Sequence, residues 1–239
     1  MTSMKNWRSK GSSGVFNFPL LLKNDFITYY SISSPVSVDF RIIKEFAFDL
    51  DDMPSPFHIC PKGTGKLTLT GNTSDLLIIS YEGFINQCKR PSTFLDQRKK
   101  CDYIVISDRL EILLVEITSA TGSVANLLKP ILDNRGAVMF PGGKYEKVER
   151  QLEQSLQTIM AVPSINNAIV KLHKKTALMA YRVYPSSLHS IVRTGAYSRY
   201  LAIESNETQE NGAVLSCPQI ESFGFEYRRI NHRSAFRVV

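Results

Sequence analysis

The stretch CDYIVISDRLEILLVEIT, residues 101–118, contains two short apolar runs separated by the polar tripeptide at 107–109. Runs rich in Ile, Leu and Val around a tight polar connection predict two antiparallel strands joined as a hairpin. One acid, Asp102, opens the first strand, and another, Glu116, stands near the end of the second. Carboxylates inside strands built for burial need an explanation.

The two carboxylates fall near the same end of the predicted hairpin, so their side chains could converge. An unpaired ionised group is costly to bury, so we expect each to be paired, hydrogen-bonded or bound to a cation. Two oxygen ligands at such an edge suit Mg²⁺ or Mn²⁺, which would activate water and stabilise charge at a phosphodiester. The simpler alternative is that Asp102 caps a strand end while Glu116 pairs with an Arg or Lys.

The segments around the hairpin predict a helix, two strands, a second helix and a further strand. Residues 146–161 have the clearest helical pattern, and 176–184 indicate a buried strand. Residues 72–88 predict the other helix, with Glu82 off its apolar stripe, although the LLIIS run at 76–80 leaves a strand as the alternative. The stripe of the clearest helix consists of Val148, Leu152, Leu156, Ile159 and Met160.

The rest of the chain divides around this α/β core. Residues 15–50 predict strands, or a strand and a short helix, and 51–66 form a Pro- and Gly-rich loop. The KGTGKLT sequence in and after this loop lacks the spacing and the Ser or Thr of a phosphate-binding loop, so we expect a hairpin turn. Residues 121–144 read as an insertion. We predict an N-terminal segment (1–60), a core (61–194) and a basic C-terminal extension (195–239).

The chain carries a formal net charge of +7 and has a pI near 9.2. Part of the excess lies in three clusters, at 88–102, 171–175 and 227–237. This balance favours a polyanion such as nucleic acid as partner, although any one cluster also fits a solvated face.

The cysteine and histidine residues are too scattered for a structural zinc site. The longest apolar runs fall far short of the roughly 20 residues that span a bilayer, and the first residues do not form a secretory signal. We therefore expect a cytoplasmic protein with free thiols and no membrane partner.

The order of these elements resembles the PD-(D/E)xK nuclease superfamily over roughly residues 73–184. In that family an acid begins the second core strand, E-x-K lies on the third, and a helix carrying a Gln often follows. The matching sequences here are CDYIV with Asp102, VEIT with Glu116 and VERQLEQSL with Gln151. A Glu from the first helix sometimes joins the family's site, and YEGF would supply Glu82.

The resemblance implies a restriction-endonuclease-like mixed sheet flanked by helices, with N- and C-terminal additions. It implies that Asp102 and Glu116 bind Mg²⁺ or Mn²⁺, and that the protein hydrolyses DNA or RNA, with DNA favoured over RNA as the partner. It further implies a role in defence against foreign DNA such as phage, with protein subunits of a defence complex as partners.

Thr118 departs from the family, because it stands where the third motif has a lysine. Threonine donates one hydrogen bond and carries no charge. The best substitute is Lys147, which shares one flank of the 146–161 helix with Gln151 and Gln154. Lys100, two residues before the first acid, is a poorer substitute, and a solvated helix lysine is the simpler interpretation of Lys147.

Three functions therefore compete. The first is a metal-dependent nuclease, and the second is a catalytically degenerate nuclease-like subunit that binds nucleic acid or serves as a scaffold in a larger complex. The third is an α/β interaction protein without a polyanion partner. Divalent-metal binding separates the first from the others, and salt-sensitive DNA binding separates the second from the third.

Overall fold

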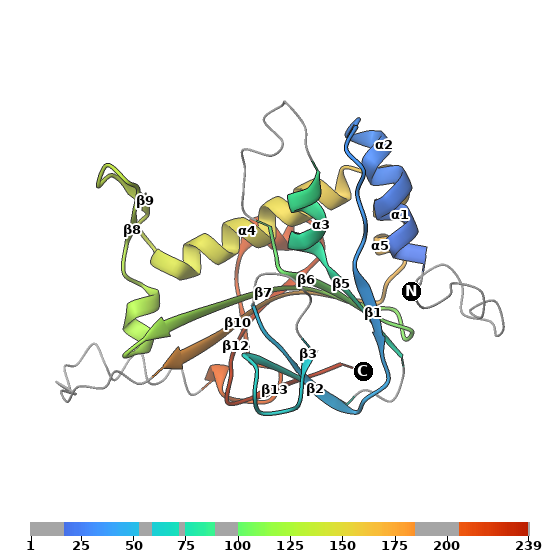
Figure 1. Cartoon of the computed structure of the whole chain (residues 1–239). Coiled ribbons are helices and arrows are strands. Elements are labelled where there is room, and N and C mark those ends of the chain that lie inside the picture. The colour runs from blue at the N-terminus through green and yellow to red at the C-terminus, as the bar shows by residue number, and fades with distance from the viewer. Residues whose placement is uncertain (1–16, 53–58, 72–74, 89–99, 185–205, 239) are drawn as a thin grey trace.

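The computed structural model describes residues 17–52, 59–71, 75–88, 100–184 and 206–238. Within these residues the chain is a mixed α/β protein with a seven-stranded sheet, a four-stranded sheet and a two-stranded ribbon (Figure 1). The α/β class predicted from the sequence is confirmed.

Several sequence predictions lie outside the described residues. These are the N-terminal stretch before residue 17, the first residues of the helix predicted at 72–88, and most of the basic cluster at 88–102.

The large sheet runs in the order β1-β5-β6-β7-β10-β12-β11. The strands β1, β5, β6 and β7 pair antiparallel with one another, whereas β7, β10 and β12 run parallel. The strand bounds are Phe40–Ile43 (β1), Leu76–Ser80 (β5), Tyr103–Ser107 (β6), Glu111–Thr121 (β7), Lys174–Tyr184 (β10), Ala213–Leu215 (β11) and Glu226–Asn231 (β12).

The hairpin predicted from residues 101–118 is confirmed as β6 and β7. Tyr103 pairs with Val115, and Ile106 pairs with Ile112. The turn closes with a hydrogen bond of 3.2 Å from the Leu110 amide to the carbonyl of Ser107, and Leu110 has a φ of 67°. The Ile- and Val-rich strands are buried on both faces, which explains their nearly continuous apolar sequence.

The helix α4, Gly143–Met160, lies across one face of the large sheet (Figure 1). It begins three residues before the predicted start because Glu146 accepts a hydrogen bond of 2.9 Å from the Gly142 amide. Gly143 has a φ of +69°, and a Cβ there would lie 2.4 Å from the carbonyl oxygen of Leu127, so only glycine fits. Of the predicted stripe, Val148, Leu152, Leu156 and Ile159 are buried, and Met160 is half-buried.

The segment 72–88 differs from the predicted helix. Leu76–Ser80 is strand β5, paired with β1 and β6, and the helix α3 spans only Tyr81–Gln87. The LLII run favours the strand because it can bury both faces between two partners. The helix begins where the carbonyl of Asp102 accepts hydrogen bonds from the amides of Tyr81 and Glu82, at 2.9 and 3.3 Å.

The smaller sheet runs in the order β13-β4-β2-β3 and packs on the face of the large sheet away from α4 (Figure 1). The loop at 61–66 joins β3 to β4, but β2 lies between these strands, so the predicted hairpin turn is a crossing connection instead. The bounds are Ala47–Leu50 (β2), Ile59–Cys60 (β3), Leu67–Thr70 (β4) and Ala235–Arg237 (β13).

Shorter elements complete the described chain. The N-terminal helical segment packs beside α4, where the hydroxyl of Tyr30 donates to the carbonyl of Thr158 at 2.9 Å. The predicted insertion at 121–144 forms a 3₁₀ turn and the two-stranded ribbon. The bounds are Phe18–Leu21 (α1), Leu22–Phe26 (η3, a π-helix), Ile27–Tyr29 (α2), Val124–Leu127 (η4), Ile131–Leu132 (β8), Val138–Phe140 (β9), Pro163–Val170 (α5) and Pro218–Glu221 (α7).

Among the described helices, none is long and apolar enough to cross a membrane.

Candidate active site

The register of β6 and β7 places the two predicted carboxylates opposite each other. Since Tyr103 pairs with Val115, one step further along the ladder sets Asp102 across from Glu116. Residues opposite each other in an antiparallel pair have Cβ atoms about 4.5–5.5 Å apart. The hairpin therefore brings the two acids to one end of the ribbon, as the sequence predicted. That one ion bridges them stays a prediction.

Glu116 is buried, with 5% of its surface exposed. The side-chain amide of Gln151 donates to its Oε1 at 2.7 Å, but its Oε2 is buried without a hydrogen-bond partner among the described residues. Burial raises the pKa of Glu116, and the negative charges of Asp102 and Glu82 raise it further. The carboxylate is thus held in an environment that disfavours its charge unless a cation approaches.

Asp102 lies at the start of the hairpin and joins three elements. Its Oδ2 accepts a hydrogen bond of 2.7 Å from the Ile117 amide on β7, while its carbonyl caps the first turn of α3. Burial raises the pKa of Asp102 to about 8, against the opposing effect of the Ile117 amide. The nearby charges of Glu82 and Asp52 also raise this pKa, and Lys66 lowers it.

The helix α4 is bonded to the chain just before β6. The Ser155 hydroxyl accepts a hydrogen bond of 2.8 Å from the Cys101 amide and donates one of 2.7 Å to the carbonyl of Gln151. Gln151 also approaches the carbonyl of Lys100, at 3.4 Å. This arrangement fixes the distance between the helix and the hairpin end, and holds the Gln151 amide on Glu116.

The other two predicted site residues, Glu82 and Lys147, lie near the same end of the sheet. Glu82 is exposed as a residue, yet surrounding atoms desolvate its carboxyl and raise its pKa. The half-buried Lys147 lowers the pKa of both Glu82 and Glu116. The elements α3, β6, β7 and α4 thus gather all five predicted residues: Glu82, Asp102, Glu116, Lys147 and Gln151.

Lys144 is a further cation beside Thr118 that the sequence analysis missed. Its ammonium donates to the carbonyl of Ser119, and burial together with the charge of Lys147 lowers its pKa. Thr118 lies on the same face of β7 as Glu116, because side chains alternate along a strand. The signal in the sequence was the i, i+3 spacing of Lys144 and Lys147, which places both lysines on one flank of the helix.

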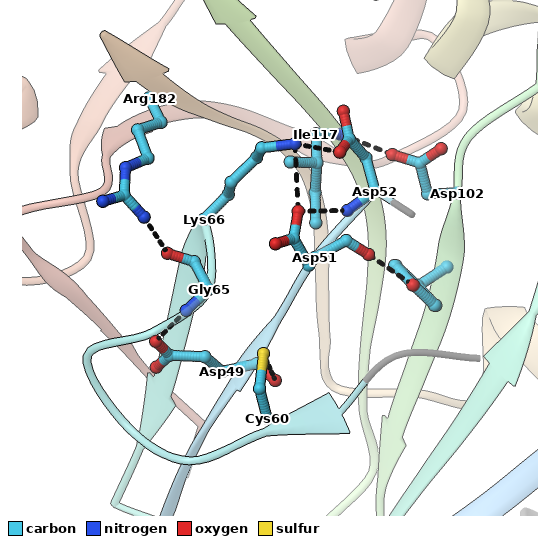
Figure 2. A network of polar contacts seen from close by, with 10 residues as sticks. Asp49, Asp51, Asp52, Cys60, Gly65, Lys66, Asp102, Ile117 and Arg182 are labelled. Atoms are coloured by element: carbon cyan, nitrogen blue, oxygen red, sulfur yellow. Dashed lines mark hydrogen bonds and ion pairs between the residues drawn. The ribbon is translucent and has the colours of Figure 1, made fainter. Parts of the chain in front are cut away.

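The smaller sheet brings a second group of charges that the sequence analysis also missed (Figure 2). The ammonium of Lys66 bonds Asp51 Oδ1 at 2.9 Å and also bonds Asp52 Oδ1. The Tyr103 hydroxyl donates to the carbonyl of Asp51 at 2.5 Å, which ties this group to β6. The sequence showed these residues only as parts of a polar loop, and the pairing of β2 with β4 is what brings them together.

The residues present fit a small divalent ion. No three acidic, His or Cys side chains in the described part of the chain are grouped closely enough to hold a metal by themselves. Mg²⁺ commonly takes one or two carboxylates and completes its octahedron with water and phosphate oxygens. The partnerless Oε2 of Glu116, across from Asp102, suits that kind of site.

The chain matches no known family model, no curated protein and no solved structure.

Proposed function

We propose that this protein is a divalent-metal-dependent nuclease with a restriction-endonuclease-like core. The order of strand β6, strand β7, helix α4 and strand β10 supports this. Asp102 directly precedes β6, Glu116 lies on β7 and Gln151 lies on α4, in the order that the resemblance implies. The mixed sheet, antiparallel at β6 and β7 and parallel at β7 and β10, agrees with that proposal.

One observation carries the proposal: a buried glutamate with a partnerless oxygen lies across a hairpin from a second acid of raised pKa. In a protein whose acids were only structural, such a pair would be matched by Arg or Lys. Among the described residues, neither Asp102 nor Glu116 forms an ion pair with a Lys, Arg or His. Their environment instead favours an external cation.

Asp102 and Glu116 would hold the Mg²⁺ or Mn²⁺ ion. When bound, such an ion supplies charge stabilisation at a phosphodiester and a more acidic water. In the hydrolysis, the water oxygen forms a bond to phosphorus, one P–O ester bond breaks, and the departing oxygen takes a proton. The products are a phosphomonoester and a hydroxyl.

The chain's own residues arrange this chemistry. Gln151 holds Glu116 Oε1 by its amide, so that Oε2 stays directed away from the helix amide. The Ile117 amide orients Asp102 in the same way. Lys147 offers positive charge beside Glu116 and Glu82, which would offset the charge developing on the phosphate.

The charge of the chain supports a nucleic-acid substrate. The resemblance favours DNA over RNA. We further propose a cytoplasmic role in defence against foreign DNA, such as that of phage, together with protein subunits of a defence complex. The resemblance alone supports this last step.

A second candidate is a degenerate nuclease-like subunit that binds nucleic acid without cleaving it. Thr118 favours it, because the uncharged side chain lies on the same face of β7 as Glu116. The two candidates share the fold and the binding surface, and differ only in metal binding and cleavage.

The test is calorimetry with Mn²⁺ followed by plasmid nicking and single-strand RNA cleavage with both metals. Asp102→Ala and Glu116→Ala should lose Mn²⁺ binding and cleavage. Asp108→Ala removes an exposed acid from the turn of the same hairpin and should change neither. Metal-independent DNA binding without cleavage would favour the second candidate, and cleavage that survives Glu116→Ala would place the activity elsewhere.

A further inference from the structure

The Lys66 ammonium lies among the carboxylates of Asp51 and Asp52, which the smaller sheet brings close to Asp102. Its side chain is 11% exposed and bonds both Asp51 and Asp52. Figure 2 shows it reaching from the start of β4 toward Asp52 and Asp102. We propose that Lys66 is a second cationic residue of the candidate active site, and that with Lys147 it supplies the charge that Thr118 does not. This inference rests on the proposed nuclease function.

The loop before Lys66 is held at both of its glycines. Asp49, which is 1% exposed, accepts hydrogen bonds of 2.8 Å at Oδ2 from the amides of Gly63 and Gly65. The guanidinium of Arg182, from the large sheet, donates to the carbonyl of Gly65 at 3.1 Å. A Cβ on Gly65 would lie 2.7 Å from the carbonyl oxygen of Leu50, so the loop passes too close for any other residue.

These contacts fix the backbone at the residue before Lys66. The Lys66 amide itself donates to the carbonyl of Leu50 at 2.9 Å. The lysine therefore extends from a rigid backbone. A charge held in place before the substrate arrives is the kind that lowers a reaction barrier, because little reorganisation is needed during the reaction.

The ammonium has one donor to spare. It carries three N–H groups, and the two aspartates take two of them. The third has no partner among the described residues, and the side chain keeps some contact with solvent. A non-bridging oxygen of a phosphodiester near Asp102 could accept it. The lysine stays charged throughout and moves no proton.

Asp51 and Asp52 keep that lysine protonated. Burial lowers the pKa of Lys66, but the hydrogen bonds and charges of the two aspartates outweigh it and raise the pKa overall. Lys147, on the opposite face of the large sheet, makes no hydrogen bond or ion pair among the described residues. The two lysines thus approach the site from different layers, Lys66 beside Asp102 and Lys147 beside Glu116, and of these two only Lys66 is held by ion pairs within the described part of the chain.

The first test is Lys66→Met, which keeps the length of the side chain and removes its charge. Cleavage should fall about 10²- to 10³-fold, as expected for one preorganised electrostatic donor. The affinity for Mn²⁺, measured by calorimetry, should be unchanged or higher, because a positive charge near the anionic site has been removed. The matched control is Lys62→Met, an exposed lysine of the same loop, which should match the wild type in both assays.

The second test uses compensation. Thr118→Lys in the Lys66→Met protein should recover at least tenfold of the lost cleavage, because it restores a cation on the Glu116 face. If Lys66→Met does not fold, Lys66→Gln replaces it in both tests, since it keeps donors for the aspartates and removes only the charge.

The outcomes separate the inference from the proposed function. A wild-type protein that neither binds Mn²⁺ nor cleaves overturns the proposed function and the inference with it. If the wild type cleaves and Lys66→Met cleaves at a rate within threefold of it, the inference is overturned and the proposed function stands. Loss of Mn²⁺ binding together with cleavage in Lys66→Met also overturns it, because Lys66 would then only support the fold of the metal site.

Discussion

Glu116 combines burial with an unpartnered oxygen, and this combination has a cost in stability when no metal is bound. Because the folded protein raises the pKa of Glu116, the charged form at neutral pH destabilises the fold. Glu116→Gln should therefore raise the free energy of unfolding by about 1–3 kcal/mol in EDTA, since it removes a buried charge and keeps the shape. Urea denaturation at pH 7.5 measures this.

The same variant should gain no stability from Mn²⁺, whereas the wild type should melt at a higher temperature as Mn²⁺ is added. Asp108→Asn, at the exposed hairpin turn, should behave as the wild type in both conditions. A Glu116→Gln protein that is less stable than the wild type in EDTA would show that the carboxylate has a structural partner.

Asp102 makes stability depend on pH in a defined direction. Its pKa is about 8 in the folded protein, against about 4 in an unfolded chain, so the folded state binds the proton more tightly. The stabilising effect is complete below about pH 4 and is lost as pH rises through about 8, with a slope of at most about 1.4 kcal/mol per pH unit.

Metal-free wild-type protein should thus lose stability between pH 5 and pH 9, and Asp102→Asn should show a flatter profile. Asparagine retains an oxygen for the Ile117 amide, so the hydrogen bond at this position is kept. Saturating Mn²⁺ should flatten the wild-type profile too, because metal binding displaces the proton. An equal slope in wild type and variant would contradict the assignment of the titration to Asp102.

Lys147 is the surrogate cation that the sequence predicted, and its test is independent of Lys66. Lys147→Ala should reduce cleavage about 10²-fold while leaving salt-dependent DNA binding largely intact, because binding depends on many Lys and Arg residues. Nicking assays and filter binding over a range of salt measure the two effects. Unchanged cleavage would indicate a solvated helix lysine.

The acids and the glutamine of the site could be predicted because each belongs to a local pattern. Asp102 and Glu116 interrupt apolar strands of one hairpin, and Gln151 lies on an evident helix. Lys66 and Asp52 could not, because Lys66 lies just before β4 and Asp52 just after β2, and their meeting depends on strand pairing that no local pattern encodes.

Among the elements, the α4 helix was predicted well and β5 was not. The apolar stripe along residues 146–161 is long enough for its helical period to be recognised in the sequence. The LLIIS run is too short for its period to decide, and its pairing partners β1 and β6 lie far from it in sequence. The segment forms a strand because its side chains are buried on both faces of the sheet, between the partners β1 and β6.

The stripe of α4 should carry much of the stability of the sheet face beneath it. Leu152 is 0% exposed, and Leu152→Asp should prevent stable folding because it buries an unpaired charge. Leu152→Ala should fold but lose about 2–5 kcal/mol, which urea denaturation measures. Gln157→Asp places the same charge on an exposed position of this helix and should yield a folded protein. A well-folded Leu152→Asp protein would contradict this packing.

At the level of the whole chain, the smaller sheet joins segments that the sequence analysis kept apart. Strands β2 and β3 come from residues 1–60, β4 from the predicted core and β13 from the C-terminal extension. The division into three segments followed composition and loop signals, which carry no information about pairing between distant strands. Together with the large sheet, these strands enclose a second apolar layer that includes Leu67, Leu69, Leu178 and Phe236.

This shared sheet predicts that the chain unfolds as one cooperative unit. Phe236, on the C-terminal strand β13, is 0% exposed and packs in the layer between the sheets. Phe236→Ala should lower the free energy of unfolding by about 3–5 kcal/mol without splitting the transition, because its loss affects strands from all three segments. Circular dichroism and tyrosine fluorescence should report coincident urea transitions, and Val214→Ala, at a 55% exposed position on β11, should leave the midpoint unchanged. A separate early transition in Phe236→Ala would instead show that the smaller sheet unfolds independently, and Lys66 would then be held less rigidly than its contacts indicate.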